Sequence, residues 1–117
     1  ELGRLTALQE LQVNNNALTG TLPTEVGELI NLQLLYVDSN RLIGSLPTEL
    51  GRLTALLELR IFNNSFTGTL PTELVQMVGL ESLDLSNNSF TGTIPSELAD
   101  NLGMNFSFHE NDFTDGN

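Results

Sequence analysis

Large apolar residues recur at a fixed interval along this chain, and polar residues occupy equally regular positions between them. When the sequence is set in rows of 24, three columns are apolar in every row: Leu5, Leu29, Leu53 and Met77; Leu8, Leu32, Leu56 and Leu80; Leu11, Leu35, Leu59 and Leu83. The next three columns hold Val13, Val37, Ile61 and Leu85; Asn16, Asn40, Asn64 and Asn88; Leu18, Leu42, Phe66 and Phe90. Each row therefore spells L-x-x-L-x-L-x-x-N-x-L. A period of roughly 20 to 50 residues predicts an array of stacked repeats. The alternation in x-L-x-L-x predicts one short strand per repeat, in a parallel sheet whose leucines point into the core.

The second half of each row repeats a phrase rich in glycine and proline: LTGTLPTEVG, LIGSLPTELG, FTGTLPTELV and FTGTIPSELA. Glycine suits backbone that bends tightly, and proline removes a hydrogen-bond donor where the chain turns. We expect the chain to turn toward the opposite side of the array at Pro23, Pro47, Pro71 and Pro95. The asparagine column predicts a ladder, because a carboxamide supplies both a donor and an acceptor to backbone groups that would otherwise be buried unpaired.

The longer phrase L-T-G-x-L-P-x-E-L-G, which occurs in four consecutive rows, resembles the plant-specific class of leucine-rich repeats (LRRs). That class includes the ectodomains of receptor-like kinases and receptor-like proteins, and the polygalacturonase-inhibiting proteins. The resemblance implies an α/β fold: a right-handed, horseshoe-type solenoid with a concave parallel β-sheet, a short second sheet and convex 3₁₀ or helical turns, in about five repeats of about 23–24 residues. It also implies an extracellular or cell-surface location, although a cytoplasmic one stays open.

We expect one repeat array over residues 1–117, with repeats at 5–28, 29–52, 53–76 and 77–100, a partial repeat at 101–117, and residues 1–4 as the remnant of an upstream repeat. Residues 1–8 are identical to residues 49–56, so we expect an internal segment of a longer array. In the last row Phe106, Phe108, Asn111 and Phe113 each come one place earlier than the period requires, which indicates a deletion near Asp100.

Strand residues that alternate with the core leucines should face solvent and form columns across five strands. The first column holds Glu10, Leu34, Glu58, Ser82 and Asn105; the second Gln12, Tyr36, Arg60, Asp84 and Ser107; the third Asn14, Asp38, Phe62, Ser86 and His109. These columns vary while the core columns do not, and they contain the only tyrosine, as is typical of a recognition surface. We therefore predict a non-catalytic module that binds a protein or peptide, with carbohydrate as a further option, at Leu34, Tyr36, Asp38, Glu58, Arg60, Phe62 and Asp84.

Other interpretations stay open. The repeats could be a structural spacer whose exposed strand residues bind nothing, since single exposed apolar groups are common. Two columns rich in threonine could instead bind ice or another surface: Thr19, Ile43, Thr67 and Thr91; Thr21, Ser45, Thr69 and Thr93. Threonine is also an ordinary strand residue. A convex column of Glu25, Glu49, Glu73 and Glu97 is expected to meet free backbone donors at the start of each turn, as a solvated face or a weak attractant for calcium.

Composition and charge argue against several classes of function. Fifteen acidic residues, four arginines and no lysine give a net charge of −11, which opposes binding to nucleic acid. No apolar run is long enough to cross a membrane within this segment, and the absence of cysteine excludes thiolate catalysis and thiolate metal sites. His109, beside Ser107 and Glu110 on the edge of an open sheet, lacks the converging geometry of a catalytic site. We therefore predict no enzyme activity, no cofactor and no metal site.

Three Asn-x-Ser sequences match the acceptor pattern for N-glycosylation, at Asn63, Asn87 and Asn105. Such a short pattern is easily matched by chance in an asparagine-rich chain. If the protein is secreted, glycans at these positions would shield part of the variable strand face.

Overall fold

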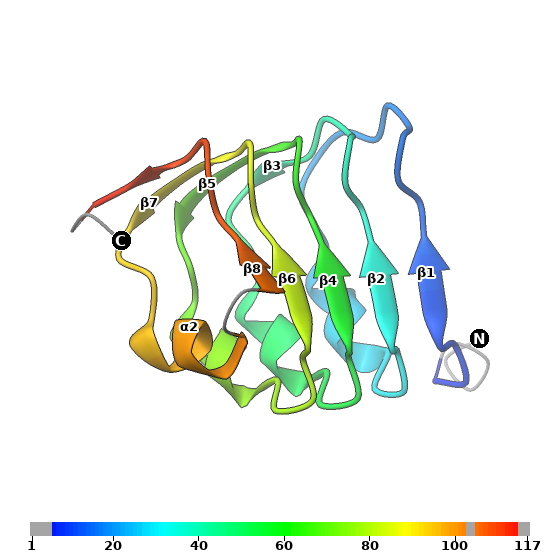
Figure 1. Cartoon of the computed structure of the whole chain (residues 1–117). Coiled ribbons are helices and arrows are strands. Elements are labelled where there is room, and N and C mark those ends of the chain that lie inside the picture. Colours follow the sequence, from blue (N-terminus) through cyan, green and yellow to red (C-terminus); the bar gives the residue numbers. More distant parts are fainter. Residues whose placement is uncertain (1–5, 103–104, 115–117) are drawn as a thin grey trace.

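The structure is a computed structural model that describes residues 6–102 and 105–114. The chain coils through successive repeats and lays one strand of each repeat beside the strand of the repeat before it (Figure 1). The main sheet has five parallel strands, which are β1 (Glu10–Gln12), β2 (Leu34–Tyr36), β4 (Glu58–Arg60), β6 (Ser82–Asp84) and β8 (Phe106–Ser107). We call its solvent-facing side the concave face. The predicted solenoid and its parallel sheet are confirmed.

A second sheet of four strands runs beside the first: β3 (Ile43–Gly44), β5 (Ser65–Thr69), β7 (Ser89–Gly92) and β9 (Asp112–Phe113). Glycine precedes the turn out of this sheet at Gly20, Gly44, Gly68 and Gly92, with φ between 79° and 84°. Only glycine adopts such angles without a steric penalty. The small second sheet that the resemblance implied is therefore confirmed.

Short helical turns close each repeat on the convex side. Among the residues that the structure describes, these turns include three 3₁₀ helices, η1 (Thr24–Glu28), η2 (Thr48–Arg52) and η3 (Thr72–Gln76), and then the α-helix α2 (Ser96–Leu102). Pro23, Pro47 and Pro71 cap the 3₁₀ turns in an extended conformation, which proline's restricted φ favours. The fourth turn lies where the sequence loses its regular spacing, and it is longer than the others and α-helical.

Close stacking of the convex turns depends on glycine. A β-carbon added to Gly51 of η2 would lie 2.6 Å from the carbonyl oxygen of Glu73, and one added to Gly27 of η1 would lie 2.7 Å from that of Glu49. The equivalent position in η3 is Val75, which is half-buried. Helix α2 stacks on η3 less closely than the 3₁₀ turns stack on one another, as expected where a side chain separates two elements.

The core is a strip of leucines between the sheets and the turns. The apolar side chains of β2, β4 and β6 and of the residues just after these strands are almost fully buried: Leu35, Val37, Leu59, Ile61, Leu83 and Leu85. Phe66, Phe90 and Phe113 stack along the array, with ring centroids 6.0 and 6.1 Å apart. Each unit thus buries its apolar side chains against its neighbours, as in other repeat arrays.

The asparagine column ties consecutive repeats together through the backbone. Asn88 accepts a hydrogen bond from the Phe66 N–H at 3.0 Å and donates to the carbonyls of Ile61 at 3.0 Å and Leu85 at 3.1 Å. Asn40, Asn64 and Asn111 make the equivalent set of bonds. The predicted role of the carboxamide as both donor and acceptor is confirmed. Each hydrogen bond of the ladder joins an asparagine side chain to the backbone.

Candidate functional site

The variable columns lie in register on the concave face. Leu34 of β2 pairs with Glu58 of β4, which pairs with Ser82 of β6, and Tyr36, Arg60 and Asp84 align in the same way. The phase read from the repeats is therefore right: Leu35, Leu59 and Leu83 point inward, and the residues on either side point outward.

Tyr36, Glu58 and Arg60 form one interacting cluster on this face. The Tyr36 hydroxyl donates to Glu58 Oε1 at 2.5 Å, and Arg60 Nη2 donates to Glu58 Oε2 at 3.1 Å. The Arg60 guanidinium carbon lies 4.3 Å from the centre of the Tyr36 ring, within the range of a cation–π interaction. Glu58 thus holds both partners, one with each carboxylate oxygen.

The cluster orients side chains more than it stabilises the fold. The Arg60 side chain is 45% exposed and that of Glu58 28%, and ion pairs so open to solvent contribute only about 0 to 1 kcal/mol. The hydrogen bond to Glu58 is the main cause that raises the pKa of Tyr36 above its ordinary value of 10.0; desolvation raises it further, while the charge of Arg60 lowers it. The phenol therefore stays a hydrogen-bond donor at neutral pH.

A depression of about 390 Å³ adjoins this cluster. Its lining combines charged, aromatic and small polar side chains from β4, β6 and the start of β8: Arg60, Phe62, Ser82, Asp84, Asn105 and Ser107. Asp84 Oδ1 accepts hydrogen bonds from the Ser86 backbone N–H at 3.0 Å and the Ser86 hydroxyl at 2.6 Å. Of the seven predicted binding residues, Arg60, Phe62 and Asp84 thus share one hollow, and Tyr36 and Glu58 contact its edge through Arg60.

Asp38 was predicted to face solvent, but the structure buries it. Its exposed fraction is only 4%, and its Oδ1 atom has no hydrogen-bond partner. The backbone bonds from Asn15 N–H to the Asp38 carbonyl and from Ser39 N–H to the Phe62 carbonyl place Asp38 between Asn14 and Phe62 in the third column. A short carboxylate beside a phenylalanine is easily shielded from water, which the alternation of the strand alone does not reveal.

Burial affects the ionisation of this carboxyl group. Desolvation raises the pKa of Asp38 above its ordinary value of 3.8, and the nearby charge of Asp84 raises it further. Hydrogen bonding within the Asp38–Ser39 segment and the charge of Arg60 lower it in part. Leu34 and Phe62, predicted as exposed apolar anchors, are half-buried.

The other predicted features have mixed outcomes. In the second sheet, Thr69 pairs with Thr91 and Thr67 with Ser89, so threonines at equivalent repeat positions do not face each other across the strands.

Glu25, Glu49 and Glu73 lie in the first turn of η1, η2 and η3, but none of these turns has a side-chain cap. Each carboxylate instead accepts a long hydrogen bond, 3.4 to 3.5 Å, from the hydroxyl of the preceding threonine. The predicted position of these carboxylates at the start of each turn is confirmed, but their hydrogen bonds go to threonine hydroxyls.

The predicted glycosylation residues Asn63, Asn87 and Asn105 are exposed, and Asn63 and Asn87 have a left-handed backbone where the main strand ends. Within residues 6–102 and 105–114, no three His, Asp or Glu side chains gather as they would around a metal ion. No helix in the same ranges is both long and apolar enough to cross a membrane.

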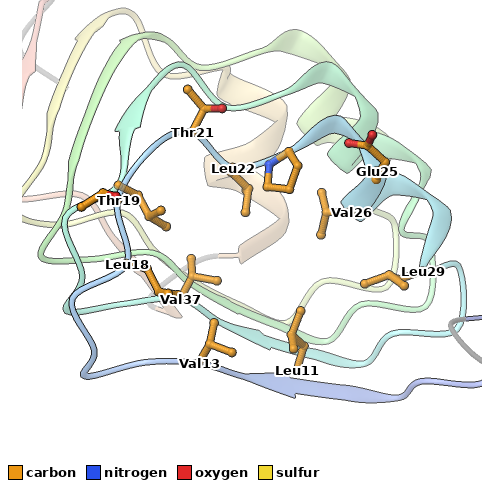
Figure 2. Close-up of a pocket in the computed structure, with 12 residues that line it drawn as sticks. Leu11, Val13, Leu18, Thr19, Thr21, Leu22, Glu25, Val26, Leu29 and Val37 are labelled. Carbon is orange, nitrogen blue, oxygen red and sulfur yellow. The ribbon is translucent and has the colours of Figure 1, made fainter.

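The sequence did not predict a second hollow, also of about 390 Å³, at the end of the array that carries β1 (Figure 2). Leu11, Val13, Leu22, Val26 and Leu29 converge on it from β1 and the start of the convex side. These are the same repeat positions that stay buried between neighbours farther along the array. The hollow is therefore the end of the core strip, and it lacks the convergent polar groups of a specific binding site.

The leucine-rich repeat family model matches this chain four times in succession, at residues 7–29, 31–53, 55–77 and 79–101. The chain is a leucine-rich repeat protein. None of the curated proteins matches it. Its solved structural neighbours include plant receptor ectodomains, which confirms the predicted plant-type LRR class.

One neighbour is a TDR receptor, with 38% identity, a TM-score of 0.88, and coverage of 96% of this chain and 20% of that one. Another is the Arabidopsis receptor kinase HAESA in complex with the peptide hormone IDA and the co-receptor SERK1, with 32% identity, a TM-score of 0.85, and coverage of 96% and 19%. A third is a plant ice-binding protein, with 30% identity, a TM-score of 0.87, and coverage of 96% and 37%. The LRR array described here thus spans well under two thirds of the length of each.

Proposed function

We propose that this LRR chain is a non-catalytic recognition module that binds an extended segment of a protein or peptide across the concave face. The observation that carries the proposal is the cluster of Tyr36, Glu58 and Arg60 beside the depression lined by Phe62 and Asp84. Aromatic residues and arginine are the side chains that most often dominate binding energy at interfaces. Glu58 holds two of these side chains in place before a ligand arrives, which lowers the entropic cost of binding.

The likeness to HAESA, whose structure contains a peptide hormone, supports a peptide ligand and an extracellular location. The exposure of Asn63, Asn87 and Asn105 is compatible with glycosylation outside the cell. Asn63 and Asn87 lie where main strands end, so glycans there would border the concave face and leave its centre at Tyr36 and Arg60 accessible. Asn105 lines the depression, so a glycan there would cover part of it.

Selection from a random library of displayed peptides tests the proposal. The chain is immobilised and the enriched peptides are measured against the wild type, a Tyr36→Ala/Phe62→Ala variant and a control variant, Thr67→Ala/Thr91→Ala, on the second sheet. We expect affinity to fall at least tenfold for the concave variant and to stay unchanged for the control, with all three chains equally folded by circular dichroism. If the chain is only a spacer, no peptide should be enriched, or the enriched peptides should bind the wild type and the Tyr36→Ala/Phe62→Ala variant with the same affinity.

Ice binding is a second candidate, because the plant ice-binding protein has the same fold over 96% of this chain. The second sheet exposes Thr67, Thr69 and Thr91, with exposed Thr93 just after β7, a polar surface of the kind that could order water. Across this sheet Thr69 pairs with Thr91, and Thr91 pairs with Asp112, so a carboxylate interrupts the line of threonines. Inhibition of ice recrystallisation by the wild type, and its loss in Thr69→Ala/Thr91→Ala, would support this function; no inhibition would exclude it.

A further inference from the structure

The concave face combines an excess of negative charge with a guanidinium that is already engaged. Glu10, Asp38, Glu58 and Asp84 supply four carboxylates to the variable columns, against the single guanidinium of Arg60. Arg60 turns toward Glu58 and Tyr36. In the part of the chain that the structure describes, this is the one salt bridge, and Asp38 and Asp84 have none.

Asp38 is the least satisfied of these groups. With an exposed fraction of only 4% and no donor to Oδ1, it carries the penalty of an unpaired buried acceptor. The repeats elsewhere place small or neutral side chains in the same column, including Asn14 and Ser86, so the solenoid itself does not require a carboxylate there. Buried unpaired groups that the fold does not require are characteristic of functional sites.

We propose that Asp38, with Asp84, forms a cation-recognition subsite of the concave face, which takes the lysine ammonium or arginine guanidinium of an extended peptide. Donors from such a group would satisfy Asp38 Oδ1, and its charge would offset the negative excess around it. Ion pairs with desolvated carboxylates and several donors are among the stronger polar interactions. The inference rests on the proposed function, since it specifies the ligand of the same face.

The engagement of Arg60 by Glu58 has a role in this arrangement. While Glu58 and Tyr36 hold the guanidinium, Arg60 forms no salt bridge with Asp38 or Asp84, and its charge lowers the pKa of Asp38 only in part. Glu58 is therefore a positioning residue that keeps the subsite open for an external cation. Replacement by glutamine releases Arg60 to pair with the free carboxylates and compete with the ligand.

The test uses peptides enriched from the random library described above. We expect them to contain a lysine or arginine, and a double-mutant cycle is measured with one such peptide. The protein change is Asp38→Ser, which copies the serine of Ser86, and the peptide change is the basic residue to glutamine. Each single change should weaken binding about tenfold or more, and the two together should weaken it little further, since they remove the same interaction. Asp112→Asn, an exposed carboxylate on the second sheet, is the matched control and should have no effect.

A stability measurement separates a binding role from a structural one. If Asp38 is unpaired in the free protein, Asp38→Ser should leave the urea midpoint unchanged or raise it while binding is lost; a lower midpoint overturns the proposal. The proposal is also overturned if the enriched peptides bind the concave face without a basic residue. It is overturned as well if the affinity losses of the two single changes multiply in the double-mutant cycle. Either result leaves the proposed function standing. Failure to enrich any peptide that depends on Tyr36 and Phe62 overturns both.

Discussion

The asparagine ladder predicts that Asn88→Ala is far more destabilising than Asn16→Ala, although both residues occupy the same column. Asn88 is 9% exposed and bonds to two repeats. Asn16 is exposed and donates only to the Val13 and Asn14 carbonyls of its own repeat.

The magnitude follows from which groups keep a partner. Without the Asn88 side chain, the Ile61 carbonyl still accepts from Asn64 and the Leu85 carbonyl from Asn111. The Phe66 N–H has no such substitute: Ser65 N–H donates to Leu42 on the preceding repeat, and so the next amide points the other way, toward Asn88. A buried orphan donor costs about 1–3 kcal/mol, and each weakened bond up to about 1 kcal/mol more. We expect a loss of about 2–4 kcal/mol for Asn88→Ala and at most about 1 kcal/mol for Asn16→Ala.

Urea denaturation measures both variants, followed by circular dichroism and by the fluorescence of Tyr36, the only tyrosine in a chain without tryptophan. With a slope of about 2 kcal/mol per molar, Asn88→Ala should lower the midpoint by about 1–2 M. Coincident transitions by the two probes would justify the two-state treatment. Equal losses in the free energy of unfolding for the two variants would refute the claim that the asparagine column stabilises the fold through hydrogen bonds between repeats.

Three further predictions concern single residues. Gly51→Ala should destabilise the fold by about 1–3 kcal/mol, because its new β-carbon would overlap the next convex turn; an unchanged melting temperature contradicts the close stacking. Absorbance titration of the sole tyrosine should give a raised pKa for Tyr36 that Glu58→Gln lowers toward 10.0; no change on substitution means that the hydrogen bond is absent in solution. The raised pKa of Asp38 means that the folded state holds its proton more tightly, so its destabilising effect is absent below about pH 3.8, develops as pH rises from there and is complete above the folded-state pKa. Asp38→Asn should therefore match the wild type in stability at about pH 3 and exceed it at about pH 7, and a constant difference across this range would argue against the burial.

Most of the scaffold could be predicted from the sequence because each structural role is repeated. Four copies of the same spacing place Leu35, Leu59 and Leu83 inside, and the bonds of Asn64 follow from what a carboxamide can donate and accept. The irregular spacing after Pro95 marked the last turn as different, but did not show that this turn would be α-helical.

The site was less predictable because it depends on single side chains without repeated counterparts. Strand alternation placed Asp38 and Phe62 on the same face but could not show that the carboxylate is buried there. Nor could it decide whether Arg60 pairs with Glu58 or with a carboxylate on a neighbouring strand. The pairing of the threonines across the second sheet was also unpredictable from the sequence. Thr67 corresponds to Thr91 in the repeat, but the second sheet pairs Thr67 with Ser89.

The most direct test of recognition by the concave face is the footprint of a bound peptide on the amide spectrum of the ¹⁵N-labelled chain. A peptide enriched from the random library is titrated, and the shifts of backbone amides are mapped onto the two sheets and the convex turns. If the concave face binds the peptide, shifts should concentrate at residues 34–38, 58–62 and 82–84, with the second sheet unaffected. Shifts confined to the threonine strands β5 and β7, or to the turns η1–η3, would contradict it.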